Sequence, residues 1–232
     1  MSKNLFRVFR WLDPQKKLCK PIGLAFIISN NGIFITAKHV LTLRGKIKNP
    51  KLFGVLFLKN KEPLILTVRN ILLHDKADIA LGLLDNISNQ NRRNHIEPED
   101  FHLCMVIPDE GEEVSTFAYS KDTNILYNIY DLKINNEIKW AYGIVRKYYP
   151  NGRDSYLLPG PCVETSMTLE AGLSGGPVIN KNGQIIGVNS TSFTGQEKDI
   201  SYFTPINPIA NISFETESEG KRIKTTLLDL VN

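Results

Sequence analysis

The chain holds a serine between glycines in the stretch Gly172-Leu173-Ser174-Gly175-Gly176-Pro177. Glycine permits backbone conformations that a Cβ would block, and it leaves room for a second backbone to approach. A tight turn of this composition exposes the Ser174 hydroxyl and directs successive N–H groups outward, where they can bind an oxyanion. The stretch therefore favours a turn that carries a nucleophile for acyl transfer. The alternative is a glycine-rich hairpin corner with an incidental serine.

Size and composition are those of a globular protein. The 232 residues suffice for one large or two small domains, and 42% are hydrophobic and 22% charged. The net charge of +4 is small for this length. The basic residues near the start alternate with apolar ones, which predicts a solvated strand face and no nucleic-acid partner. They are Arg7, Arg10, Lys16, Lys17 and Lys20.

Targeting and cysteine patterns predict a cytoplasmic protein. Residues 1–11 lack an apolar stretch of signal-peptide length, and the most apolar run, residues 22–28, is too short to span a bilayer. We therefore expect no membrane association. Cys19, Cys104 and Cys162 are odd in number and widely spaced, which argues against a disulfide framework and against a zinc site.

Short β-rich segments separated by turn residues recur along the whole chain. About a dozen strands and almost no helix are expected, arranged as sandwiches or barrels. The turn residues at 108–111 predict a boundary between a first domain, residues 1–110, and a second domain, residues 111–232. A hairpin is expected between residues 125–134 and 137–149. Residues 223–231 have the spacing of a closing amphipathic helix.

A serine hydroxyl is a weak nucleophile and needs a base, and the base must lie before Ser174 in this chain. The four histidines are His39, His74, His95 and His102. No histidine follows the serine, which excludes the α/β-hydrolase arrangement despite its similar glycine-serine-glycine pattern. His39 follows a predicted strand and would lie at a barrel edge. The other three are in polar contexts and are expected to be surface histidines.

Asp78 begins an otherwise apolar strand. A carboxylate there is costly to bury unless it is hydrogen-bonded, and an imidazole N–H would satisfy it. Asp75 and Asp85 fit turn positions better. Because His39 and Asp78 fall in the first half of the chain and Ser174 in the second, we expect a site between two β domains.

Three stretches together resemble the signatures of trypsin-like (chymotrypsin-fold) serine peptidases. They are Thr36-Ala37-Lys38-His39-Val40, Ala77-Asp78-Ile79-Ala80-Leu81 and Gly172-Leu173-Ser174-Gly175-Gly176-Pro177. The resemblance runs from about residue 23 to 206 and is strongest to bacterial, disulfide-free HtrA/Deg peptidase domains. It implies an all-β fold of two six-stranded antiparallel Greek-key β-barrels, here with a short C-terminal helix.

The resemblance also implies a serine endopeptidase. Ser174 would form the acyl-enzyme, His39 would act as general base and then general acid, and Asp78 would orient His39. The N–H groups of Gly172 and Ser174 would form the oxyanion hole. This chemistry needs no metal and no cofactor. The expected partner is a protein or peptide substrate, and cleavage of one specific protein target is favoured. A regulatory protein is a second class of partner.

Substrate-binding residues follow from the same resemblance. Thr168, six residues before the serine, corresponds to the base of the specificity pocket. Ser190, Thr191 and Ser192 correspond to the strand that pairs with the substrate backbone, and Ser201 to the far wall of the pocket. A neutral threonine predicts an uncharged P1 residue, the residue before the cleaved bond. Glu197 or Asp199 would reverse this preference if either turned inward.

Two departures from the family pattern argue against known ways of regulating such peptidases, namely N-terminal cleavage and a PDZ domain. Leu173 stands where zymogen-activated members carry an aspartate, so activation by N-terminal cleavage is not expected. Only 26 residues follow Ile206 (232 − 206), too few for a PDZ domain. Two other functions remain open: a trypsin-like binding module whose loop at 167–172 is ordered only by a partner, and a dedicated esterase. The substrate-pairing strand at 190–192 favours peptides over simple esters.

Overall fold

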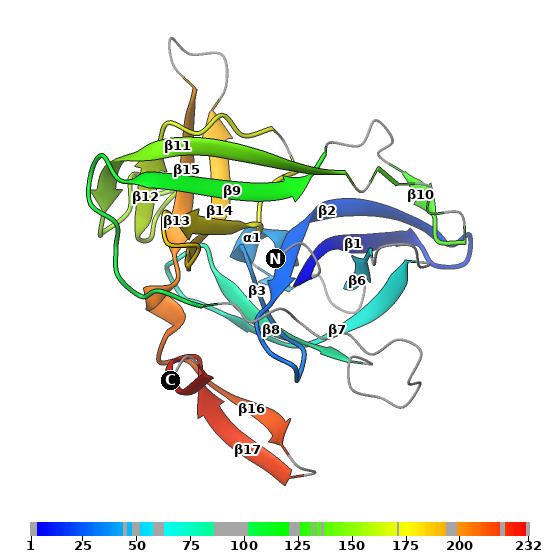
Figure 1. The fold of residues 1–232 in the computed structure, drawn as a ribbon. Coiled ribbons are helices and arrows are strands. Elements are labelled where there is room, and N and C mark those ends of the chain that lie inside the picture. The colour runs from blue at the N-terminus through cyan, green and yellow to red at the C-terminus, as the bar shows by residue number, and fades with distance from the viewer. Residues whose placement is uncertain are drawn as a thin grey trace.

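Two antiparallel β-barrels account for most of the chain in the computed structural model (Figure 1). The structure describes residues 4–43, 46–47, 52–57, 63–85, 102–120, 126–130, 132, 134–135, 137–170, 172–193, 199–218 and 221–230. Strands dominate these residues, and each helix among them is a single turn. The predicted fold class, an all-β protein of two six-stranded antiparallel barrels, is confirmed.

The first barrel contains six strands and closes by pairing its first two. The strands are β1 (Leu5–Asp13), β2 (Leu18–Ile27), β3 (Ile33–Thr36), β6 (Leu52–Leu56), β7 (Leu64–Leu73) and β8 (Ala80–Asp85). Their order is β1-β6-β7-β8-β3-β2, and β1 also pairs with β2. Phe6 and Phe34 fill the interior, where their rings meet edge to face with centroids 5.4 Å apart. A short pair of strands, β4 (Thr42–Leu43) and β5 (Lys46–Ile47), lies outside this ring.

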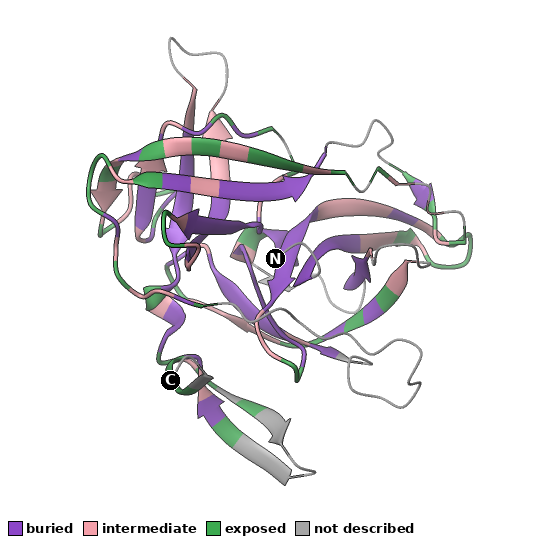
Figure 2. Ribbon diagram, in the orientation of Figure 1, coloured by how far each residue is buried: buried purple, intermediate pink, exposed green. Residues whose placement is uncertain are grey.

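The second barrel is also closed. Its strands are β9 (Glu113–Tyr119), β11 (Ile138–Tyr149), β12 (Cys162–Thr165), β13 (Pro177–Asn180), β14 (Ile185–Phe193) and β15 (Ile200–Pro205), in the order β11-β12-β15-β14-β13-β9. Figure 2 shows β11 alternating between exposed and half-buried residues over most of its length. This is a period of two, and its exposed face carries the apolar side chains of Trp140, Tyr142 and Ile144.

The two barrels share one hydrophobic core. Phe117 and Ile179 of the second barrel belong to the same buried cluster as Leu24 and Val40 of the first. Gly23 lies where the barrels meet, because a Cβ there would lie 2.9 Å from the carbonyl oxygen of Ser174. Close approach of two backbones therefore depends on glycine at this position.

The predicted hairpin between residues 125–134 and 137–149 is wrong. β11 pairs with β9 and β12, while the short strand β10 (Tyr127–Asn128) pairs with β2 of the first barrel. Alternating hydrophobicity identifies a strand, but it does not name the strand's partner. Closure of the second barrel decides the pairing of β11.

The predicted C-terminal helix at residues 223–231 is also wrong. The chain forms a hairpin of β16 (Ser213–Ser218) and β17 (Lys221–Thr226), which extends away from the barrels in Figure 1. Only a 3₁₀ turn, η3 (Leu228–Leu230), follows. Thr225 and Leu227 are buried, whereas Lys224 is exposed and Thr226 is half-buried, which is a period of two and not the helical spacing. The pairing with β16 satisfies the backbone and selects the strand.

The segment between β8 and β9 contains the predicted domain boundary after residue 110. In its described part, Leu103 bridges to Ile185 of β14, and Gly111 turns with a φ of 89°. The division at residue 110 stays a prediction. No helix in the part of the chain that the structure describes has the length and apolar character needed to cross a bilayer.

Candidate active site

His39 is presented by a single helical turn, α1 (Lys38–Leu41), directly after β3. Val40 and Leu41 are buried in the core, so the turn is anchored while His39 remains on the surface. The backbone N–H of His39 donates to Oδ1 of Asp78 at 2.9 Å, and its Nδ1 lies 2.7 Å from Oδ2. Because a carboxylate can only accept, Nδ1 carries the proton and Nε2 is the basic nitrogen of the neutral ring.

Asp78 lies just before β8 with only 14% of its side chain exposed. In addition to the two contacts from His39, the hydroxyl of Ser190 donates to its Oδ2. Burial raises the pKa of Asp78, but the hydrogen bond and charge of His39, the Ser190 hydroxyl and the His39 N–H together hold its pKa below the ordinary value. Asp78 is therefore an anion at neutral pH, able to stabilise a positive charge on His39.

The turn that carries Ser174 is hydrogen-bonded to both barrels. Its carbonyl accepts from the N–H of Leu24 in β2 at 2.8 Å, and the N–H of Gly175 donates to the carbonyl of Asn189 in β14 at 2.8 Å. The Ser174 hydroxyl donates to the carbonyl of Ser190 at 2.9 Å. Ser174 is thus held where the barrels meet, as the positions of His39 and Asp78 in the chain predict.

Ser190 connects the nucleophile candidate with the carboxylate. Its carbonyl contacts Ser174 and its hydroxyl contacts Asp78, which is 112 residues away in the chain. From the sequence, Ser190 is predicted only as a substrate-binding residue. No local pattern predicts its contact with Asp78, because the contact exists only once the two barrels have packed together.

The N–H groups of Gly172 and Ser174 are the predicted donors of the oxyanion hole. Gly172 is exposed with a φ of 99°, and nothing lies within 4 Å of the position that a Cβ would take. Within the described residues, the N–H groups of Gly172 and Ser174 have no acceptor, whereas that of Gly175 is bonded to Asn189. Two free donors next to a serine hydroxyl are what an oxyanion requires.

The predicted specificity residues lie around the end of β14. Thr168 is exposed, and its hydroxyl donates to Oδ2 of Asp199 at 3.1 Å. Thr191 and Ser192 are half-buried, and the Ser192 hydroxyl donates to the carbonyl of Leu169 at 3.1 Å. Ser201 is fully buried, with its hydroxyl 2.7 Å from that of Thr165. Glu197 lies outside the described residues.

The remaining histidines are separate from the cluster of His39, Asp78 and Ser174. His102 is exposed, and His95 lies outside the described residues. His74 is half-buried in the loop before Asp78, and its imidazole accepts backbone hydrogen bonds. The prediction of a plain surface histidine is therefore wrong for His74.

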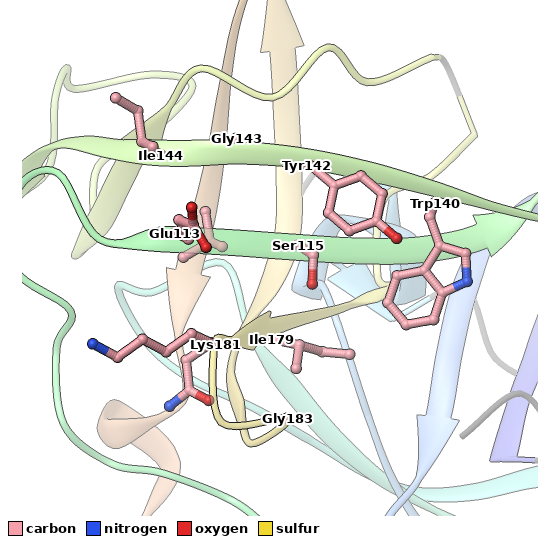
Figure 3. A pocket seen from close by; sticks show the side chains of 11 residues that line it. Glu113, Ser115, Trp140, Tyr142, Gly143, Ile144, Ile179, Lys181 and Gly183 are labelled. Atoms are coloured by element: carbon pink, nitrogen blue, oxygen red, sulfur yellow. The ribbon is translucent and has the colours of Figure 1, made fainter.

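A cavity of about 600 Å³ opens elsewhere, on β9, β11 and β13 (Figure 3). The side chains of Trp140, Tyr142 and Ile144 project from β11, and Lys181 lies on the opposite side of the cavity. None of the residues of the His39 cluster lines it. Concavity alone does not locate the candidate site, which is defined by its hydrogen bonds.

Replacing Gly175 with alanine is expected to destabilise the protein by several kcal/mol. A Cβ would lie 1.9 Å from the carbonyl oxygen of Leu24 and 2.4 Å from the Thr36 hydroxyl, and the φ of 89° adds strain. Gly111→Ala is the matched control, because Gly111 has the same φ but open space around it. The control should cost about 1–2 kcal/mol and Gly175→Ala about 1–3 kcal/mol more. Urea unfolding measures the free energy of unfolding of both variants. Equal losses would show that the contact of Gly175 with Leu24 and Thr36 tolerates a methyl group.

Solved structures of bacterial proteases have the same fold. The Rv3671c protease from M. tuberculosis, in its active form, superposes with a TM-score of 0.60 at 17% identity, covering 90% of this chain and 78% of that chain. The MamO protease domain from Magnetospirillum magneticum gives a TM-score of 0.59 at 16% identity, covering 88% and 93%. At such low identity these similarities establish the fold alone.

Curated relatives are named probable periplasmic serine endoproteases, DegP-like. One from Pseudomonas putida (strain W619) is 25% identical over 219 residues, covering 90% of this chain and 37% of the relative. Another from Rickettsia conorii is 24% identical over 222 residues, covering 90% and 37%. The chain thus spans about 37% of the length of these relatives.

These names contradict the predicted cytoplasmic location. The relatives are described as periplasmic, whereas the prediction rested on the lack of a signal-peptide stretch in residues 1–11 and on the absence of a disulfide framework. Cys19, Cys104 and Cys162 are indeed free. The two barrels close through strand pairing and share one core, so the fold needs no disulfide in any compartment. Cysteine count is therefore uninformative about location for this fold.

The fold and the local sequence patterns agree with a single family. A family model described as the trypsin-like peptidase domain matches residues 23–188, which contain the stretches around His39, Asp78 and Ser174. The chain belongs to the trypsin-like peptidase domain family.

Proposed function

We propose that the chain is a serine endopeptidase that cleaves peptide bonds through an acyl-enzyme on Ser174. The observation that carries this proposal is the connected set of hydrogen bonds from Ser174 to Ser190, from Ser190 to Asp78 and from Asp78 to His39. It joins a hydroxyl, a buried carboxylate and an imidazole whose Nδ1 is already protonated. Membership of the family and the endoprotease names of the relatives support the same activity.

The proposed mechanism begins with rotation of the Ser174 hydroxyl. Its proton is donated to the carbonyl of Ser190 in the resting structure. On substrate binding the hydroxyl turns to His39, and Nε2 takes the proton as oxygen attacks the scissile carbonyl. Asp78 stabilises the imidazolium that forms. The N–H groups of Gly172 and Ser174 bind the oxyanion, His39 protonates the leaving amine, and water then hydrolyses the acyl-enzyme by the same steps.

An active-site probe tests this function without knowledge of the substrate. Wild type and Ser174→Ala are treated with a fluorophosphonate and their masses are measured. Labelling of wild type alone supports the proposal, because the probe requires an activated serine and an oxyanion hole. Absence of labelling in folded wild type contradicts it and favours the alternative, a binding module whose loop at 167–172 needs a regulatory partner. Equal labelling of both would place the reactive group elsewhere.

We further infer that the enzyme prefers a basic P1 residue. Thr168, the expected base of the specificity pocket, is hydrogen-bonded to the carboxylate of Asp199. Asp199 is one of the two acids, with Glu197, that would reverse the predicted preference for an uncharged residue. A carboxylate that accepts one hydrogen bond from Thr168 retains further lone pairs for an ammonium or guanidinium group.

Peptides that differ only at P1 measure this preference. Arginine or lysine at P1 should give a kcat/KM about tenfold above leucine, the lower end of what a hydrogen bond to a charged group contributes. Asp199→Asn should bring the ratio close to one. Glu215→Gln, an exposed acid on β16, is the control and should leave the ratio unchanged. A wild-type preference for leucine would restore the original prediction of an uncharged P1 residue.

A further inference from the structure

The loop between β7 and β8 is closed around the imidazole of His74. Nδ1 of His74 accepts the N–H of Ala77 at 2.8 Å and that of Lys76 at 3.2 Å. The backbone N–H of His74 donates to the carbonyl of Ile79 at 3.1 Å. Nδ1 can accept only in the neutral ring with its proton on Nε2. The turn that ends in Asp78 therefore requires a neutral His74.

Two residues of α1, Lys38 and His39, form hydrogen bonds to the same loop. Nζ of Lys38 donates to the carbonyls of His74 and Asp75 at 2.8 and 2.9 Å. Its neighbour His39 bonds the carboxylate of Asp78 through its backbone and its ring. The geometry between His39 and Asp78 thus depends on the shape of the loop that links these two contacts.

The loop is also pressed against the second barrel. Ala77 is fully buried, and a Cβ on Gly160 would lie 2.5 Å from the carbonyl oxygen of Lys76 and 2.6 Å from Cα of Ala77. The backbone of Lys76 and Ala77 is therefore closely packed against that of Gly160. Asp78, the next residue in the chain, is the part of this loop that contacts His39.

Charge around His74 favours its neutral form. Burial and the nearby ammonium of Lys38 lower the pKa of His74 below its ordinary value, while Asp75 opposes them. The other charged or titratable groups on these two elements are His39 on α1, and Lys76 and Asp78 on the loop. A proton on Nδ1 would face the two N–H groups of Lys76 and Ala77, so donor would meet donor and the turn would open.

We propose that His74 is a positioning residue for Asp78: its neutral imidazole holds the turn that presents the carboxylate to His39, and its protonation releases that turn. This inference rests on the proposed function of His39 and Asp78. It predicts a pH dependence of activity that protonation of His39 alone would not produce. Activity falls at acid pH through two protons, one on the general base and a second on His74.

The pH dependence of kcat/KM separates the two protons. In wild type, the slope of log(kcat/KM) against pH should be about 1 where one proton inactivates the enzyme, and it should steepen to about 2 at lower pH where both protons are bound. His74→Asn keeps an acceptor for the same turn but cannot titrate, so its slope should stay at about 1 with near wild-type kcat at pH 8. His74→Ala loses the acceptor, and kcat should fall about tenfold at all pH values with KM little changed. His102→Asn, an exposed histidine elsewhere, should behave as wild type.

A spectroscopic measurement tests the inference without turnover. The proton that His39 Nδ1 donates to Asp78 is expected far downfield in the proton NMR spectrum. In wild type it should be lost at acid pH, whereas in His74→Asn it should persist to lower pH. Urea midpoints at pH 8 show whether each variant is folded.

Failure of the function and failure of the inference give different results. Wild type without Ser174-dependent turnover contradicts the proposed function, and the downfield proton then decides the role of His74. A slope of about 2 in His74→Asn, or a downfield proton with the same pH limit in both proteins, overturns the inference even if the enzyme is active.

Discussion

Ser174→Ala is expected to lower kcat for peptide hydrolysis by about 10⁶-fold and to change KM only a few-fold. The hydroxyl forms the acyl bond, while the groups around it bind the substrate and remain in place. Any residual rate would come from the N–H groups of Gly172 and Ser174 and from binding alone. Cleavage of a quenched fluorescent peptide measures the change, with the enzyme concentration set by active-site titration of wild type.

Ser155→Ala provides the control for that measurement, because Ser155 is an exposed serine outside the site. It should retain wild-type turnover. If Ser174→Ala cleaved the peptide as fast as wild type, Ser174 would not be the nucleophile, and the proposed function would fail.

Asp78→Asn is expected to lower kcat by about 10⁴-fold near pH 7. The amide has the size of the carboxylate, but it has one acceptor oxygen in place of two. In the wild type, the carboxylate accepts hydrogen bonds from the backbone N–H and the Nδ1–H of His39 and from the hydroxyl of Ser190. An amide N–H facing Nδ1 would favour the wrong tautomer, which places the proton on Nε2 and removes the base.

The lowered pKa of Asp78 determines the pH range over which Asp78→Asn should differ from wild type. The pKa of Asp78 is held below its ordinary value, so the stabilising negative charge is present above about pH 4 and is lost only as pH falls through the lowered value. Protonation of Asp78 therefore does not account for a loss of wild-type activity between pH 5 and 8. Asp78→Asn should lose activity across that whole range. Asp109→Asn, an exposed aspartate between β8 and β9, should leave the profile unchanged, and a loss of less than tenfold in Asp78→Asn would show that the charge is dispensable.

Local sequence patterns predicted the parts of the site that depend on one residue type in one setting. A serine between glycines, an acid that begins an apolar strand and a histidine after a strand each need only neighbours in the chain. The structure links Ser174 to Asp78 through Ser190 and joins Asp78 to His39, while the catalytic roles of these residues stay a prediction. The β-rich character followed from the same kind of local signal, because short strands and turns recur throughout, whereas the two six-stranded barrels were implied by the resemblance to trypsin-like peptidases.

The errors concern partners and not strand character. β11 was predicted as a strand but assigned to a neighbour in sequence, whereas it pairs with β9 and β12. Residues 223–231 were predicted as a helix because apolar residues fit one helical face, whereas the pairing with β16 makes residues 221–226 a strand. Backbone hydrogen bonds between strands join distant segments, and a pattern within one segment carries no information about them.

The sequence by itself determined that this chain is an all-β protein with a serine, a histidine and an aspartate in the order of a trypsin-like peptidase. Only the tertiary structure decided that Ser190 contacts Asp78, that Asp199 lies beside Thr168, and that His74 caps the turn before Asp78. The first two contacts arise from packing of segments that are remote in the chain. The third is local, but a histidine nitrogen accepts only in one protonation state, and burial together with the charge of Lys38 sets that state.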